Sequence, residues 1–315
     1  MRKLIKYFNQ NRKKILLIVL IIVFLIILVR VLSYSIKINE QEKNNSISNN
    51  DSNKDTSIPV ETIISGEEIP EEDAIENKDI IDKFVKACNN KQYTEAYDML
   101  SNKCKNNVFN DTIENFINNY VQIIFEPSKT YKLEGWLSKE NLTYKITYIN
   151  DDILATGGKY EGLNYTDYIT IDREQKLNIF SFIGETDLNI VESKNNITMQ
   201  IVSMETYMNE VIYNILVSNN NEETILLSNY DDNKQICLID SNDIEYIAYL
   251  NEIPQNNLIF ESGVKKQISI KFSKSYSSNS KIEKMLFKNI YLNYEEYIKN
   301  GDNDNIEKIQ FKIDI

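Results

Sequence analysis

The feature that most constrains this chain is an unbroken run of fifteen apolar residues, ILLIVLIIVFLIILV, at positions 15–29. The segment 15–36 is about 22 residues long, or roughly 33 Å as an α-helix, which matches a hydrocarbon core of about 30 Å. A helix that is apolar on every face has no side to turn toward water. We therefore predict a transmembrane helix over residues 15–36, with these side chains among those that anchor it in lipid: Ile15, Leu20, Phe24 and Val29.

The charges that flank this run predict its orientation. Six basic residues precede it, and the first acidic residue of the chain is Glu40. The positive-inside rule therefore predicts a cytosolic tail over residues 1–14 and an extracellular C-terminal part. A cleaved signal peptide is the alternative, but Ser33-Tyr34-Ser35 is the only small-residue site near the run, which favours an uncleaved anchor. The predicted topology determinants are Arg2, Lys3, Lys6, Arg12, Lys13 and Lys14.

Charge also limits the partners of the extracellular part. The whole chain carries a formal charge of −12, and eight basic side chains with no acidic ones lie in residues 1–37, which leaves −20 for residues 38–315. Such a surface repels phosphate backbones, so we expect no nucleic-acid binding by this part. The expected partners are membrane lipid and other envelope proteins, and the oligomeric state stays open.

The chain after the run divides by pattern. Residues 37–78 are polar and acidic without periodicity, which indicates a flexible stalk. Three amphipathic helices then follow, with apolar stripes that begin at Ile80, Tyr93 and Ile113. Alternating segments come next and predict strands at 129–137, 142–150, 165–172 and 177–183. This order predicts an α+β domain over residues 79–185, in which three helices cover a curved antiparallel sheet.

From residue 195 onward the pattern changes to strands alone. The candidates are Ile197–Ser203, Val211–Ser218, Thr224–Leu227, Gln235–Ile239, Glu245–Leu250, Lys266–Phe272, Ile282–Leu292 and Ile306–Ile313. Many short strands separated by Asn/Asp turns indicate an all-β sandwich over residues 195–315. The predicted fold class is therefore a single transmembrane helix, an α+β domain and an all-β sandwich.

The stretch FVKACNNKQYTEAYDMLS at 84–101, with Tyr93, Ala96 and Tyr97 opening its second helix, resembles the start of nuclear-transport-factor-2-like domains. These domains occur in Gram-positive single-pass membrane proteins. The order of one span, three helices and a sheet is similar to that of extracytoplasmic scaffold subunits of conjugation and type IV secretion systems, the TcpC family among them. Residues 195–315 resemble immunoglobulin-like domains of bacterial surface lipoproteins. The resemblance implies a scaffold role and a curled sheet that can enclose a pocket.

Little in the sequence indicates catalysis. The chain has no histidine, which removes Ser-His-Asp and Cys-His nucleophiles and any histidine-based zinc site. It has no glycine-rich phosphate loop. We therefore predict no catalytic, cofactor-binding or metal-ligating residue, no cofactor and no enzyme activity. The residues that could line a pocket in the curled sheet are Trp136, Tyr144, Asp167 and Tyr168. In the alternative reading, Trp136 and Tyr144 fill the core or its rim and Asp167 is a solvated strand residue.

Three functions remain open at this point. The first is a membrane-anchored extracytoplasmic scaffold or protein-interaction protein without catalytic activity. The second is a structural component of a conjugation or type IV secretion channel. The third is a small-ligand sensor or enzyme that uses the cone pocket of the first domain.

Overall fold

A computed structural model of the chain describes residues 58–150, 164–229, 235–302 and 306–315. The chain divides into two compact units, residues 1–55 and 56–315, and the described residues belong to the second. The predicted span 15–36 and the first half of the predicted stalk, residues 37–57, lie outside them, whereas residues 58–78 are described and include the start of α3. Within the described ranges, no helix is both long enough and apolar enough to cross a membrane.

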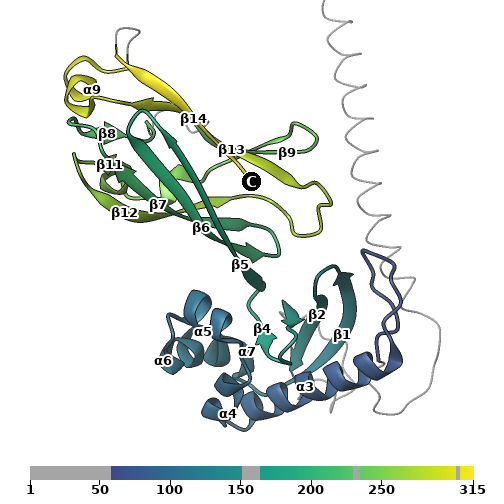
Figure 1. The fold of residues 1–315 in the computed structure, drawn as a ribbon. Coiled ribbons are helices and arrows are strands. Elements are labelled where there is room, and N and C mark those ends of the chain that lie inside the picture. Colours follow the sequence, from purple (N-terminus) through teal and green to yellow (C-terminus); the bar gives the residue numbers. More distant parts are fainter. Residues whose placement is uncertain (1–57, 151–163, 230–234, 303–305) are drawn as a thin grey trace, which may run out of the picture. The chain divides into compact units, whose positions relative to one another are not determined.

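The described part begins with a run of helices (Figure 1). Its helices are α3 (Glu71–Asn89), α4 (Tyr93–Asp98), α5 (Asn102–Phe109), α6 (Ile113–Phe116), the π-helical turn η1 (Ile117–Val121) and α7 (Gln122–Phe125). The breaks have local causes. Lys91 has a positive φ of 59°, and the side chains of Ser101 and Thr112 cap the helices that follow them.

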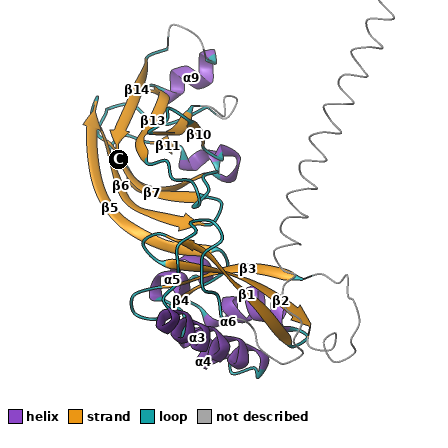
Figure 2. Cartoon of the chain, turned by 90° about the vertical axis from the view of Figure 1, so that its right-hand side faces the viewer, coloured by secondary structure: helices purple, strands orange, loops and turns teal. Residues whose placement is uncertain are grey.

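The first sheet is antiparallel and has the order β1-β2-β3-β4. Its strands are β1 (Lys129–Ser138), β2 (Leu142–Asn150), β3 (Tyr165–Ile171) and β4 (Leu177–Asn178). Figure 2 shows the helices gathered along this sheet. Phe84 of α3, Tyr120 of the π-helical turn and Tyr144 of β2 are fully buried in the core that helices and sheet share.

A long strand, β5 (Phe182–Lys194), follows the first sheet in the chain and forms the edge of a second one, with the order β12-β7-β6-β5. The other strands of that sheet are β6 (Ile197–Tyr207), β7 (Val211–Asn219) and β12 (Lys265–Phe272). The pairing of β5 with β6 shifts register twice. Such bulges bend a strand and increase its twist, so β5 can serve both regions.

The third sheet has the order β10-β9-β13-β8-β11, and β14 also pairs with β13. Its strands are β8 (Ile225–Leu226), β9 (Ile236–Asp240), β10 (Glu245–Ile247), β11 (Ile259–Phe260), β13 (Ile282–Tyr291) and β14 (Lys308–Asp314). Three short helical segments connect them: η2 (Leu250–Glu252), η3 (Gln255–Asn257) and α9 (Tyr294–Asn300).

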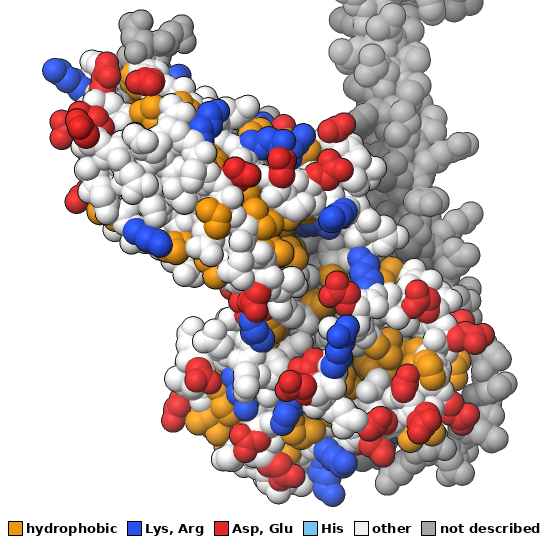
Figure 3. Space-filling model, in the orientation of Figure 1, with side chains coloured by type: hydrophobic (Ala, Val, Ile, Leu, Met, Phe, Trp, Pro, Cys, Tyr) orange, Lys and Arg blue, Asp and Glu red, His pale blue; other side chains and the backbone are white. Residues whose placement is uncertain are grey.

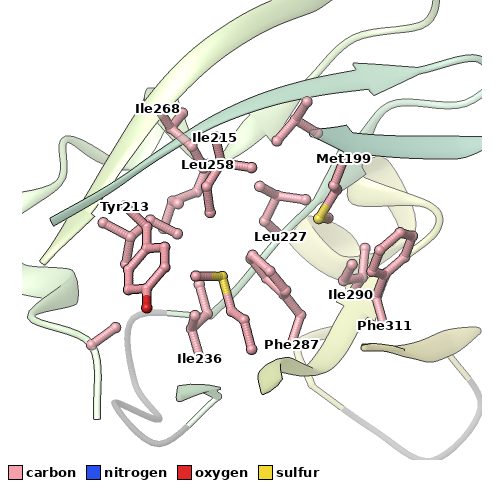
Figure 4. Packing of buried hydrophobic residues seen from close by; sticks show 14 of the residues in the cluster. Met199, Tyr213, Ile215, Leu227, Ile236, Leu258, Ile268, Phe287, Ile290 and Phe311 are labelled. Carbon is pink, nitrogen blue, oxygen red and sulfur yellow. The ribbon is translucent and has the colours of Figure 1, made fainter. Parts of the chain in front are cut away.

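The second and third sheets share one hydrophobic core. Figure 4 shows Ile215 and Ile268 of the second sheet on one side of it, and Phe287, Ile290 and Phe311 of the third sheet on the other.

The predicted fold class is wrong for the part of the chain that the structure describes. Strands account for most of its regular structure, no membrane-spanning helix occurs in it, and no three-helix arrangement of the nuclear-transport-factor-2-like kind is present. The apolar stripes do occur, but one long helix and a series of short segments carry them. The reason is local: Ser101 starts a new helix, and Asn110 and Asp111 take positive φ values. Periodicity cannot detect such breaks because the stripe continues across them.

One glycine allows the N-terminal part of this unit to lie on β1. The backbone N–H of Ile63 donates to the carbonyl oxygen of Gly135 at 2.9 Å, and that of Ile64 donates to the carbonyl oxygen of Trp136 at 2.9 Å. A Cβ atom at position 135 would lie 2.6 Å from the carbonyl oxygen of Glu61 and 2.7 Å from Cδ1 of Ile69. Only glycine therefore fits this close approach.

The substitution Gly135→Ala is expected to lower the free energy of unfolding by about 1–3 kcal/mol, because the added methyl overpacks against backbone. Chemical denaturation measures the change. Gly184→Ala is the matched control, since nothing lies within 4 Å of its Cβ position. An unchanged free energy for Gly135→Ala would show that the segment 61–69 does not rest on β1.

Candidate functional site

The four predicted pocket residues lie on opposite faces of the first sheet. Successive side chains of a strand alternate between faces, and so Asp167 and Tyr168 point apart. Trp136 and Tyr168 share the outer face, with ring centroids 5.5 Å apart, and Nζ of Lys145 lies 4.9 Å from the Trp136 ring. Tyr144 and Asp167 face the helices and are 0% and 1% exposed. The four residues therefore do not line one pocket.

Asp167 is the centre of a buried hydrogen-bond network. Its Oδ1 accepts from the backbone N–H groups of Tyr168 at 2.7 Å and Ser181 at 2.8 Å. Its Oδ2 accepts from the backbone N–H of Phe180 at 2.9 Å and from the hydroxyl of Tyr120 at 3.0 Å. The hydroxyl of Tyr148 lies 3.0 Å from that of Tyr120. Both carboxylate oxygens are thus fully used in joining protein segments.

This network holds a strained corner of the chain. Phe180 and Ser181, immediately before β5, have φ values of 60° and 62°, a region that non-glycine residues rarely adopt. Because both of their N–H groups donate to Asp167, the carboxylate compensates for the strain. Tyr120 reaches the same carboxylate from the π-helical turn, a local distortion that is frequent at special sites.

The electrostatics of the network favour a structural role. Burial raises the pKa of Asp167, although its four hydrogen bonds act in the opposite direction. Burial also raises the pKa of Tyr120 and of Tyr148 well above the ordinary value. The carboxylate is 1% exposed and accepts four hydrogen bonds, so it is not placed to exchange protons with a substrate. It is neither a pocket residue nor a solvated one.

The substitution Asp167→Asn is expected to lower the free energy of unfolding by roughly 2–3 kcal/mol. Either orientation of the amide turns an NH₂ group toward two donors, which leaves hydrogen bonds to a charged acceptor unmade. Thermal and urea unfolding measure the loss. Asp187→Asn, at an exposed position of β5, is the control that should change little. Equal stability of the two variants would contradict the role given to Asp167.

A cavity of about 690 Å³ lies elsewhere, at the open end of the core between the second and third sheets. Side chains of β5, β6 and β7 form its apolar wall, the loop between β12 and β13 forms another side, and the β1–β2 turn contributes Lys139 and Glu140. The apolar side chains of these three strands are Leu188, Ile190, Met204 and Val211, and Ile282 of β13 and Ile315 after β14 extend the wall. None of the four residues predicted from sequence takes part.

Asp240 holds the loop that borders this cavity. Its carboxylate accepts hydrogen bonds from Ser280, from the backbone N–H groups of Asn242 and Ile244, and from the hydroxyl of Tyr246 at 2.9 Å. These donors, Ser280 foremost, lower the pKa of Asp240 from 3.8 to about 2. Since Ser280 lines the cavity, the loop depends on the ionised form of Asp240.

The pH dependence of stability follows from this lowered pKa. The contribution of Asp240 is complete above the unfolded pKa of 3.8 and disappears as the pH falls toward about 2. We expect Asp240→Asn to be less stable than the parent at pH about 5 and nearly equal to it at pH about 2. Urea unfolding at a series of pH values measures the difference. A constant gap between the two proteins over this range would overturn the assignment.

Four exposed aliphatic side chains lie close together in the sequence at the start of the described chain. The exposed fractions are 37% for Ile58, 70% for Val60, 56% for Ile63 and 45% for Ile64. We call these four residues the aliphatic cluster. Exposed acidic residues flank it, and no basic residue occurs between positions 58 and 77. The acidic residues between positions 58 and 77 are Glu61, Glu67, Glu68, Glu71, Glu72, Asp73 and Glu76.

The other reactive groups of the described residues give no further site. Cys88, Cys104 and Cys237 are buried and unpaired, and burial raises the pKa of each thiol, that of Cys104 to about 12. Thiols of this kind are unreactive. No group of three or more metal-ligating side chains is found within the described ranges.

Sequence reasoning missed the cavity and the aliphatic cluster. The cluster lay within the segment read as a stalk, where the pairs Ile63-Ile64 and Pro59-Val60 were the available signal. No signal in the sequence could have revealed the cavity, because its walls come from strands that are far apart in the chain.

Comparisons with known proteins add no assignment. No family model, no curated protein and no solved structure matches this chain.

Proposed function

We propose that this chain is a membrane-anchored extracytoplasmic protein-interaction protein without catalytic activity. In this proposal residues 15–36 hold it in the cell membrane, and the unit 56–315 binds other envelope proteins from the outer side. The observation that carries the proposal is the aliphatic cluster at the start of that unit. The anchor is supported by the apolar run and its basic flank.

The cluster has the character of a binding surface. Single exposed aliphatic residues are common on protein surfaces, whereas a group of them surrounded by polar residues marks an interaction site. Here four lie within seven positions. Hydrogen bonds from Ile63 and Ile64 to β1 hold the segment in place, so little ordering entropy would be lost on binding.

The flanking charges define the class of partner. Six exposed carboxylates between positions 61 and 73 lie near the aliphatic side chains in the sequence, so a complementary surface would combine apolar and basic groups. The same charges oppose contact with anionic lipid headgroups. The surface therefore fits a protein better than the membrane that anchors it.

The double substitution Ile63→Ser and Ile64→Ser tests this surface. A photo-cross-linking amino acid at position 67, in the full chain and in living cells, should form a discrete adduct with a second protein. We expect the double substitution to reduce that adduct at least fivefold, because two buried aliphatic side chains contribute roughly 1.5–3 kcal/mol each at most. Gel shift and mass spectrometry measure the adduct.

Val191→Ser is the control, since Val191 is 54% exposed on β5, outside the cluster. It should leave the adduct unchanged. Absence of any adduct in the parent chain, or equal loss in the control, would remove the proposed surface. Recovery of a transfer ATPase or of channel subunits in the adduct would assign the protein to a conjugation or secretion system.

A further inference from the structure

We propose that the cavity at the open end of the core between the second and third sheets binds a small amphipathic carboxylate. Its apolar body would lie on β5, β6 and β7, and its carboxylate would meet the lysines at the rim. The proposal rests on the cavity alone and is independent of the aliphatic cluster.

The floor of the cavity is a continuous face of the second sheet. Thr186 of β5 pairs with Met204 of β6, and Met204 pairs with Tyr213 of β7. Leu188 and Ile190 of β5 also line the cavity, although the register of β5 against β6 shifts between Asp187 and Ile190. Leu188, Ile190 and Met204 are partly buried against the core, whereas Tyr213 belongs to it. The cavity is therefore an extension of the core that the third sheet leaves uncovered.

Tyr213 supplies an unused polar group in this apolar surrounding. Its side chain lines the cavity and is 0% exposed, and its hydroxyl has no hydrogen-bond partner among the described residues. Figure 4 shows the hydroxyl oxygen pointing away from Ile215 and Leu258. A buried polar group without a partner is costly, and because this hydroxyl is enclosed it belongs to the cavity wall and is not a contact for the ligand.

The rim is cationic on a chain that is otherwise acidic. Lys139, Lys274 and Lys281 line the cavity, and none of the ion pairs formed by the described residues includes them. Nζ of Lys139 instead donates to the carbonyl oxygens of Tyr276 and Ser278. Glu140 is the one carboxylate side chain among the lining residues, and it is exposed.

The lysines also disfavour each other. Burial lowers the pKa of Lys139, and burial together with the charge of Lys139 lowers the pKa of Lys274, whereas the charge of Asp240 acts in the opposite direction. An anion bound between them would relieve this repulsion. Figure 3 shows hydrophobic and lysine side chains next to each other on the drawn face, in the region where β5 passes.

Size and chemistry together select the ligand class. A volume of about 690 Å³ lies within the range of small-molecule sites, roughly 300–1,000 Å³. Such sites combine apolar walls with a few placed polar groups. Here the polar groups are ammonium groups and hydroxyls, which suit a carboxylate. A neutral ligand would leave the lysines unpaired.

The test uses the full chain in lipid nanodiscs of phosphatidylcholine and a dodecanoate that carries a photoactivatable diazirine at its far end. We expect saturable labelling of peptides that contain Met204 or Ile282. Dodecanoate should displace this labelling, and dodecanol should displace it at least fivefold less effectively. Peptide mass spectrometry locates the label. Labelling spread over the chain, or equal displacement by dodecanol, would overturn the proposal.

Two variants separate binding from folding. Lys274→Gln should weaken labelling at least fivefold, whereas Lys265→Gln, on β12 outside the cavity, should not. Met204→Trp fills the cavity and should abolish labelling while the unfolding midpoint stays near that of the parent. Unchanged labelling in Lys274→Gln would refute the cationic rim. Loss of labelling in phosphatidylglycerol nanodiscs would also overturn the proposal, because it would assign the cavity to a phospholipid.

Discussion

The hydrogen bonds to the carboxylate of Asp167 are the interaction on which most of this fold depends. They join β3, the π-helical turn through Tyr120, and the corner at Phe180 and Ser181. That corner directs the chain from the first sheet into β5. A buried carboxylate is expensive unless every acceptor position is used. Here two oxygens receive four donors, so the desolvation cost is offset and the direction of β5 is determined.

The direction of β5 in turn determines where the cavity forms. Its bulges shift the register twice, yet the row from Thr186 through Met204 to Tyr213 stays aligned across three strands. This face extends beyond the part that the third sheet covers, which leaves apolar side chains open at one end of the core. The loop held by Asp240 and Ser280 borders the opening, and it brings Lys274 and Lys281 to its rim.

The two proposed surfaces use opposite charge patterns. The aliphatic cluster lies near carboxylates in the sequence and fits a partner that combines apolar and basic groups, whereas the cavity has lysines at its edge and fits an anion. Electrostatics of this kind contributes more to specificity than to affinity, and the apolar area supplies the affinity in both cases. One acidic protein could thus hold a protein partner and a small carboxylate at separate places without competition between them.

The sequence by itself determined the apolar run at 15–29, its charge asymmetry and the positions of most strands, because hydrophobic periodicity is a local property. Predicted strands such as 129–137 and 142–150 match β1 and β2 closely. The predicted fold class was wrong because helix caps and positive φ values divide the helices, although the apolar stripe continues across the breaks. The predicted pocket residues do not share one pocket, because the alternation of side chains along a strand places Asp167 and Tyr168 on opposite faces of the sheet. Only the tertiary structure decided which residues share a cavity, since packing and hydrogen bonds between distant strands bring Lys139, Met204 and Lys274 together.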